Sequence, residues 1–248
     1  MRKGDAMSSI KIHPLHVGTI TRHKDSFMFK IGYGVKMDFP LMAFYIEGAG
    51  KKIIVDTGGS DPNDPVEAKL RAPYVRDKDQ EIVTALKNKV GVSPEEIDIV
   101  INNHLHWDHC AGNDLFPNAE IIVQKKELES ALNPIPLLSV AYIRKYVEEI
   151  HYTLVDGDQE IVKGVSVIFA PGHTEGLQGV LVQAKGKQYF LAGDCVPLYE
   201  SINHNPPWPN GLFVNLREYY ETQVKISKLG ASIIPGHDMK VLESEVYE

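Results

Sequence analysis

The chain has 248 residues, 43% of them hydrophobic and 24% charged, which are ordinary proportions for a globular protein. That length suits one large domain or two small ones. The formal net charge of -7, with no basic patch to neutralise phosphates, disfavours nucleic acid and anionic membranes as partners. No stretch approaches the roughly 20 continuous apolar residues of a membrane span. The polar sequence after Met1 argues against a secretory signal, so we expect a cytoplasmic protein.

The first fifth of the chain has the short apolar runs of β-strands. We predict strands over Ile10–His13, Ser26–Ile31, Leu41–Ile46 and Lys52–Val55. Glycines separate these runs, which favours antiparallel hairpins. The fourth run leads into Asp56 and a glycine turn, where the aspartate is either an ordinary turn residue or a support that orients a metal ligand.

The next segment is polar and then helical. Asp61–Asp79 is rich in polar residues and proline, which predicts a loop or a short lid. Apolar spacing predicts a helix over Gln80–Val90, stopped by Gly91. Ser93–Glu96 has an N-cap serine, a proline at the first helical position and a glutamate three residues on, which predicts one turn of helix. A buried strand over Ile97–Ile101 follows.

The second half alternates strands and helices. The predicted strands are Ala119–Gln124, Tyr152–Val155, Val165–Ala170, Gly179–Ala184, Gln188–Leu191 and Ala231–Ile234. The predicted helices are Lys125–Leu132, Val140–Ile150 and Leu216–Leu229. This alternation after a strand-rich beginning indicates an α/β (α+β) protein in which helices cover sheets.

Four potential metal ligands lie within six residues directly after the predicted strand Ile97–Ile101. His104 and His106 are two residues apart, so in an extended backbone their imidazoles leave the same side and can bind one ion. Asp108 and His109 follow where the chain begins to turn, so their side chains can diverge towards a second ion. A chance histidine-rich loop explains this spacing poorly.

Three later candidates also follow predicted strands. The full set is His104, His106, Asp108, His109, His173, Asp194 and His237. Both His173 and His237 come after a Pro-Gly pair, which holds a histidine at a strand end. Seven ligands are too many for one tetrahedral zinc but suit two divalent ions that share a carboxylate. Zinc is our expectation, and Mn, Fe and Co suit the same ligand types.

Cys110 and Cys195 each directly follow one of these candidates, and neither is needed as a ligand. Free thiols in a reducing compartment are the simpler interpretation, and a disulfide between them stays open.

The motif His104-x-His106-x-Asp108-His109, followed by His173, Asp194 and His237, resembles that of the metallo-β-lactamase superfamily. Asp56-Thr57-Gly58 upstream fits the same pattern, and the resemblance covers nearly the whole chain. It implies one domain over residues 1–248, folded as an αββα sandwich. It further implies one metal on His104, His106 and His173, a second on Asp108, His109 and His237, and a bridging Asp194.

Within the superfamily, the chain length and the gap between His109 and His173 resemble the N-acyl homoserine lactone lactonases, which are quorum-quenching hydrolases. This implies hydroxide attack on a lactone carbonyl, with Asp108 passing the proton, and a homodimer. Those enzymes usually carry a tyrosine three residues after the bridging aspartate. Pro197 stands there in this chain, and Tyr199 is the candidate to replace it.

Other functions remain open for the same ligands. A thioesterase of glyoxalase II type, a phosphotriesterase-like hydrolase or another lactonase would keep the metal site and change the substrate. An iron redox protein and a non-catalytic binding module are different classes. Nine apolar residues either line an acyl pocket or pack in the core: Met28, Phe29, Met37, Phe39, Met42, Ile202, Trp208, Leu212 and Phe213. The long loop over residues 197–215 is expected to shape specificity.

Overall fold

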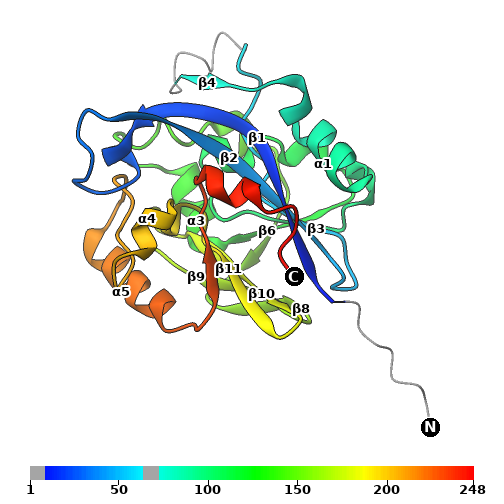
Figure 1. Cartoon of the computed structure of the whole chain (residues 1–248). Helices are drawn as coiled ribbons and strands as arrows, with labels where there is room; N and C mark the ends of the chain where they lie inside the picture. The colour runs from blue at the N-terminus through cyan, green and yellow to red at the C-terminus, as the bar shows by residue number, and fades with distance from the viewer. Residues whose placement is uncertain (1–8, 64–72) are drawn as a thin grey trace.

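The N-terminal strands form one long antiparallel hairpin. The computed structural model describes residues 9–63 and 73–248 (Figure 1). Strand β1 (Lys11–His23) pairs along its whole length with β2 (Lys36–Glu47), and β3 (Ile53–Val55) continues the antiparallel order. Antiparallel pairing of the first, third and fourth predicted strands is confirmed, although the first pairs directly with the third. The first strand is longer than its apolar pattern indicates because β2 bonds it along its whole length.

Four more strands extend this sheet to seven, in the order β4-β1-β2-β3-β5-β6-β7. Of these, β4 pairs antiparallel with β1, whereas β5, β6 and β7 are added in parallel. The added strands are β4 (Tyr74–Val75), β5 (Ile99–Ile101), β6 (Glu120–Gln124) and β7 (Tyr152–Val155). The two central strands β3 and β5 are continuously apolar and fully buried, as parallel strands covered on both faces usually are.

A second sheet has five strands in the order β12-β11-β10-β9-β8. Its strands are β8 (Gln159–Val162), β9 (Val165–Phe169), β10 (Gln178–Ala184), β11 (Lys187–Leu191) and β12 (Ser232–Ile234). The predicted hairpin between β10 and β11 is confirmed, and β12 joins β11 in parallel.

The two sheets pack face to face, and helices cover their outer faces. Phe44, Val55 and Ile99 from the first sheet and Val167 and Leu191 from the second belong to one buried cluster. Figure 1 shows α1 (Ile82–Val90) and α5 (Leu216–Ser227) on opposite sides of the molecule. The expected αββα sandwich is therefore confirmed.

The helical predictions are confirmed where local signals are strong. Helix α1 ends at Gly91 with φ of +69°, and α3 (Lys125–Leu132) has the predicted bounds. Residues Pro94–Glu96 form a single 3-10 turn closed by the predicted capping box. Two short helices, α2 (Trp107–Cys110) and α4 (Tyr199–Ile202), lie within the ligand motif and the long loop.

Two predictions were wrong. The predicted strand over 26–31 is a turn, because the Lys24 carbonyl accepts from the backbone of Phe27 and Met28 at 2.9 Å each. The predicted helix over 140–150 is a loop with one 3-10 turn, because the Ala141 carbonyl is taken by the Trp107 N–H at 2.9 Å. The first segment is also held from a distance, since the Phe29 N–H donates to the Pro209 carbonyl at 3.0 Å, so contacts between residues far apart in sequence act on both backbones.

Residues 64–72 of the predicted loop or lid lie outside the described part of the chain. Tyr74–Val75, near its end, pairs with β1 instead of lying in a loop. Within residues 9–63 and 73–248, no helix is both long and apolar enough to cross a membrane.

Candidate metal centre

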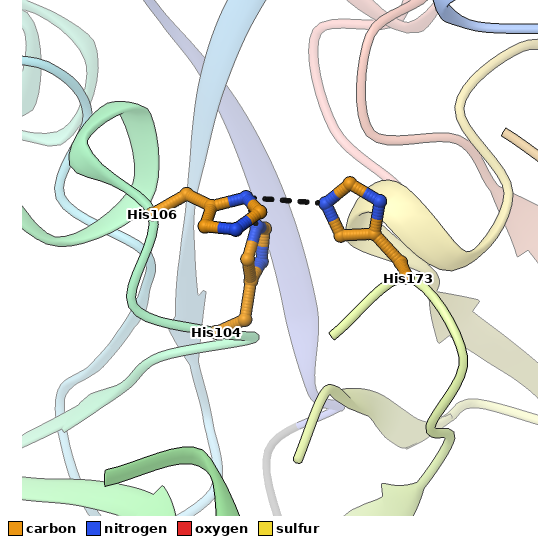
Figure 2. Close-up of side chains that lie close together, drawn as sticks. All are labelled: His104, His106 and His173. Carbon is orange, nitrogen blue, oxygen red and sulfur yellow. Dashed lines mark hydrogen bonds between the residues drawn. The ribbon is translucent and has the colours of Figure 1, made fainter. Parts of the chain in front are cut away.

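Three histidines converge on one point. His104 and His106 lie in the loop after β5, and His173 lies in the loop after β9. Nδ1 of His106 is 2.9 Å from Nε2 of His104 and 3.2 Å from Nε2 of His173 (Figure 2). All three side chains are buried. This arrangement leaves three ring nitrogens facing a common centre.

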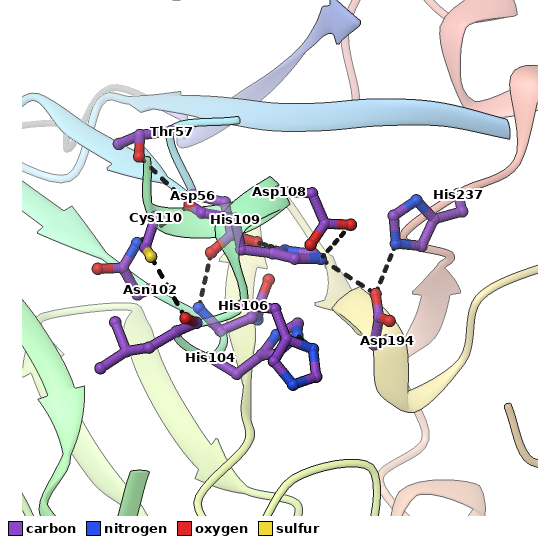
Figure 3. A network of polar contacts seen from close by, with 12 residues as sticks. Asp56, Thr57, Asn102, His104, His106, Asp108, His109, Cys110, Asp194 and His237 are labelled. Carbon is purple, nitrogen blue, oxygen red and sulfur yellow. Dashed lines mark hydrogen bonds and ion pairs between the residues drawn. The ribbon is translucent and has the colours of Figure 1, made fainter. Parts of the chain in front are cut away.

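A second group lies beside the first and contains Asp108, His109 and His237. The two aspartates on either side of His109 approach its Nε2 unequally: Oδ2 of Asp108 is 3.9 Å away and Oδ1 of Asp194 is 3.1 Å away (Figure 3). Oδ1 of Asp194 is also 2.6 Å from Nε2 of His237.

The carboxylate of Asp194 lies between the two groups. Its Oδ1 faces His109 and His237, while its Oδ2 is 3.1 Å from Nε2 of His173. The Asn210 amide donates to Oδ2 at 3.2 Å and fixes its orientation. The carboxylate can therefore reach a ligand position in each group.

Outer contacts set which ring nitrogen faces the centre. Nδ1 of His109 donates to Oδ2 of Asp56 at 2.8 Å, and Nδ1 of His173 donates to the Leu212 carbonyl at 2.8 Å. Nδ1 of His237 donates to the Pro40 carbonyl at 2.9 Å. Because Nδ1 carries a proton in each of these bonds, the neutral form of each ring presents the lone pair of Nε2 to the centre. Of the two interpretations of Asp56, the support of a ligand is the one that this geometry favours.

Electrostatics differ between the two groups. Burial, reinforced by the neighbouring histidines, holds the pKa values of His104 and His106 well below their ordinary value. Burial alone would do the same to His109, but Asp56 and Asp108 outweigh it and hold the His109 pKa well above the ordinary value. His237 and His173 outweigh burial to hold the pKa of Asp194 well below its usual range.

The donor set fits divalent metal ions. Nε2 of His109 is buried, and among the described residues it has no hydrogen bond, although Asp194 lies near it. A buried nitrogen without a hydrogen bond is costly, and a cation held between it and the nearby carboxylates would satisfy it. Imidazole nitrogens and carboxylates in two groups of three, with one carboxylate between them, suit a dinuclear site.

A cavity of about 390 Å³ opens over the cluster. Asp108, His173 and Asp194 form part of its lining, together with an apolar wall. The wall residues are Ile20, Phe27, Leu137, Leu138, Val140 and Leu212. Of the nine apolar residues proposed for an acyl pocket, Leu212 lines this cavity, whereas Met28, Phe39 and Met42 are buried in the core.

Tyr199 lies apart from the cluster contacts. Burial and the neighbouring Tyr247 raise the pKa of its hydroxyl, and its backbone N–H donates to Asp238 at 2.9 Å. Both cysteines are buried free thiols, so there is no disulfide between Cys110 and Cys195.

Four residues near the cluster escaped the sequence analysis. Arg22 lines the cavity near Asp108, Asn210 holds Asp194, and Glu127 and Tyr142 pack behind the histidines. No sequence signal identifies them, because each resembles an ordinary surface or core residue and only the fold brings it to the site.

Comparison with known proteins agrees with the geometry. Residues 38–237 match the Metallo-beta-lactamase superfamily. An N-acyl homoserine lactonase from a Bacillus species is 32% identical over 184 residues, or 71% of each chain. The lactonase AttM of Rhizobium radiobacter is 27% identical over 249 residues, or 94% of each chain.

Solved structures share the fold. An N-acyl homoserine lactone hydrolase with N-hexanoyl-L-homoserine at its catalytic metal centre has a TM-score of 0.80, with 24% identity, covering 94% of this chain and 95% of that one. The dizinc lactonase AidC has a TM-score of 0.72, with 18% identity, covering 96% and 90%. Because the sequence match runs through every residue of the cluster from Asp56 to His237, the chain belongs to the metallo-β-lactamase superfamily.

Proposed function

We propose that the protein is a dinuclear-metal hydrolase that opens the lactone ring of N-acyl homoserine lactones, a quorum-quenching reaction. The curated relatives named above, which are such lactonases, support this substrate. The observation that carries the reaction class is the position of Asp194 between two histidine groups beneath an open cavity.

In this proposal His104, His106 and His173 hold one ion, and Asp108, His109 and His237 hold the other. Asp194 lies between the two groups and would contact both ions. When bound, two divalent ions lower the pKa of a water to near neutrality and polarise a substrate carbonyl. Zinc is the metal we propose, and Fe, Mn or Co would suit the same donors.

Asp108 is the residue we assign to proton transfer. Its side chain is 14% exposed and lines the cavity, so it can meet both the attacking water and the substrate. The water oxygen bonds to the lactone carbonyl carbon while Asp108 accepts its proton. The bond from that carbon to the ring oxygen then breaks, and the proton returns to the ring oxygen. One water is consumed, and an N-acyl homoserine is released.

The apolar wall of the cavity suits the acyl chain of such a substrate. Leu137 is 88% exposed and Leu212 is 40% exposed, and both line the cavity above the cluster. Covering them with an acyl chain would bury apolar area that is otherwise in water, at about 25 cal/mol per Å².

The deciding experiment measures kcat/KM of the zinc- or cobalt-loaded protein on short- and long-chain acyl homoserine lactones by proton release. A glutathione thioester and an aryl phosphotriester are assayed beside them. We expect the lactones to exceed the other two by orders of magnitude. Inert lactones beside a rapid turnover of another ester would keep the metal chemistry and reject the substrate.

Replacing Asp108 by Asn tests the proton transfer. We expect kcat to fall by about 10²–10⁴-fold, because the amide cannot accept the proton of the water. Metal content is measured in parallel by atomic absorption, since the same residue is an assigned ligand. Near-normal turnover with both metals bound would remove this role from Asp108.

The assignment of Tyr199 to leaving-group assistance needs its own variant. Tyr199→Phe lowers kcat if the hydroxyl assists at the ring oxygen. Its position beside Tyr247 and Asp238, outside the lining of the cavity over the cluster, supports the other outcome, in which kcat is retained and Pro197 marks an enzyme without this tyrosine.

We also propose a cytoplasmic location and a homodimer of one-domain subunits. The two buried free thiols are consistent with a reducing compartment. Analytical ultracentrifugation measures the mass of the assembly directly, and a monomer at micromolar concentration would reject the dimer.

A further inference from the structure

We propose that Glu127 is a positioning residue that sets the spacing of the three histidines His104, His106 and His173 by joining the loops that carry them. The inference rests on the metal site of the proposed function. Glu127 lies in the first turn of α3, its side chain is fully buried, and the hydrolytic mechanism above does not use it.

One oxygen of Glu127 holds the loop that carries the first two histidines. Its Oε1 accepts from the backbone N–H of Leu105, the residue between His104 and His106, at 2.9 Å. The same oxygen accepts from the Tyr142 hydroxyl at 3.2 Å. The Tyr142 ring packs against the His106 imidazole, with 4.7 Å between ring centroids. Oε1 therefore holds the backbone of this loop directly and the His106 ring indirectly, through Tyr142.

The other oxygen holds the loop that carries the third histidine. Its Oε2 accepts from the hydroxyl of Thr174, directly after His173, at 2.6 Å, and from the Gly176 N–H at 3.2 Å. The approach of this loop to α3 is close, because a Cβ on Gly176 would lie 2.1 Å from the Glu127 nitrogen. A side chain at position 176 would push the two segments apart.

The site requires a carboxylate. All four neighbours donate, and an ionised carboxylate offers about four lone-pair positions and no proton. A glutamine would place its amide N–H groups either towards Leu105 and Tyr142 or towards Thr174 and Gly176. In either orientation the glutamine NH₂ group would face a backbone N–H, which is itself a donor and cannot accept a hydrogen bond. Leaving a buried donor without an acceptor is unfavourable, so the substitution would loosen one loop or the other.

The same contact connects the histidines to the wall of the cavity. Tyr142 ends the segment that contributes Leu137, Leu138 and Val140 to the cavity lining. Holding the Tyr142 hydroxyl therefore places this wall and His106 in one rigid arrangement.

The test measures cobalt binding to Glu127→Gln by chelator competition and by the visible spectrum of the bound ion. We expect one of the two ions to bind roughly 10–100-fold more weakly, as for loss of other residues that orient metal ligands. The other ion, on Asp108, His109 and His237, should keep its affinity within about threefold. Glu129→Gln, on the exposed side of the same helix, is the matched control and should leave both affinities unchanged.

Two milder variants keep the test decisive if Glu127→Gln does not fold. Tyr142→Phe keeps the ring against His106 and removes one donor to Oε1, and Thr174→Val removes one donor to Oε2. Each variant should lower the cobalt affinity of the same site by a smaller factor and alter the visible spectrum of the bound ion. Unchanged cobalt affinity and spectrum in the folded variants would overturn the role of Glu127. Because these readouts do not use turnover, lactones that prove inert would count against the proposed substrate alone.

Discussion

Asp56 illustrates how one residue can serve the backbone and the site together. Its φ of +59° lies in the left-handed region, which aspartate tolerates better than most residues. This conformation lets one oxygen accept from the Asn103 N–H at 2.7 Å and the other from the His109 ring at 2.8 Å. The turn after β3 therefore orients a candidate ligand that is 53 residues away in sequence.

We predict that Asp56→Asn lowers the affinity for the ion at Asp108, His109 and His237 by about 10–100-fold. The reason is that an amide cannot accept a hydrogen bond at both positions. The other ion should be nearly unaffected, which is the reverse of the Glu127 pattern. Competition with a chromophoric chelator measures both affinities, and the exposed Asp114→Asn serves as control. Equal weakening of the two ions would show a general loss of structure instead.

Arg22 is the cationic residue of the cavity. Burial lowers the pKa of its guanidinium, and the charge of Asp108 opposes this. Among residues 9–63 and 73–248 the guanidinium has no ion pair, so its donors are available to a ligand in the cavity.

We therefore predict that Arg22→Met raises KM for an acyl homoserine lactone by about 10-fold or more. A hydrogen bond from a charged donor contributes roughly 1.5–3 kcal/mol. We expect kcat to change by less than about threefold, because Arg22 is assigned no part in proton transfer. Steady-state kinetics separate the two constants. Lys36→Met, which removes an exposed charge from the same hairpin, should leave KM unchanged.

At the scale of elements, the β1–β2 hairpin contains a register shift between His16 and Gly18. The shift turns the His16 ring towards the segment before α1, where its Nδ1 accepts from the Gln80 amide at 3.1 Å and its Nε2 donates to Thr19 at 3.0 Å. A protonated ring would lose the bond from Gln80. Burial also disfavours the protonated ring and therefore lowers the His16 pKa.

This geometry predicts a pH dependence of stability. The unfolded chain binds the His16 proton more readily than the folded chain, so the stabilising contribution is complete above about pH 6.5 and is lost as the pH falls below it. Urea unfolding in a chelator-containing buffer at about pH 7.5 and 5.5 measures the difference. His16→Gln should lose less free energy of unfolding over this interval than the wild type. Exposed His151→Gln should behave as the wild type.

At the scale of the whole molecule, the candidate ligands connect the two sheets. His104 follows β5 of the first sheet, whereas Asp194 and His237 follow β11 and β12 of the second. Bound ions would therefore connect the two sheets of the sandwich, and their removal should lower the stability of the whole fold.

We predict that metal removal lowers the melting temperature. Free metal at about 100 times its Kd stabilises the folded state by about 2.7 kcal/mol, roughly 5–10 °C in Tm for a chain of this size. Differential scanning calorimetry of the loaded and chelator-treated protein measures the shift, and added zinc should restore it. An unchanged Tm after verified removal would mean that the ions do not stabilise the sandwich.

Local patterns were sufficient for much of the fold. The helix before Gly91, the capping box over 93–96 and the hairpin around Gly186 depend on neighbours in sequence, and all three are present. The segments 26–31 and 140–150 have equally regular apolar patterns, but long-range packing and the bond from Trp107 to Ala141 direct their backbones otherwise.

The candidate centre likewise has features that the sequence predicts and features that only the tertiary structure decides. The types of its seven candidate ligands and their places after strands could be read from the chain, because a strand end exposes the next side chains and parallel neighbours end at one edge. The sequence did not predict the roles of Glu127 and Arg22. It also did not predict the direction of the Asp56 side chain or the position of Tyr199 beside Tyr247. Each depends on groups distant in sequence that only the packed sheets bring within hydrogen-bonding or charge range.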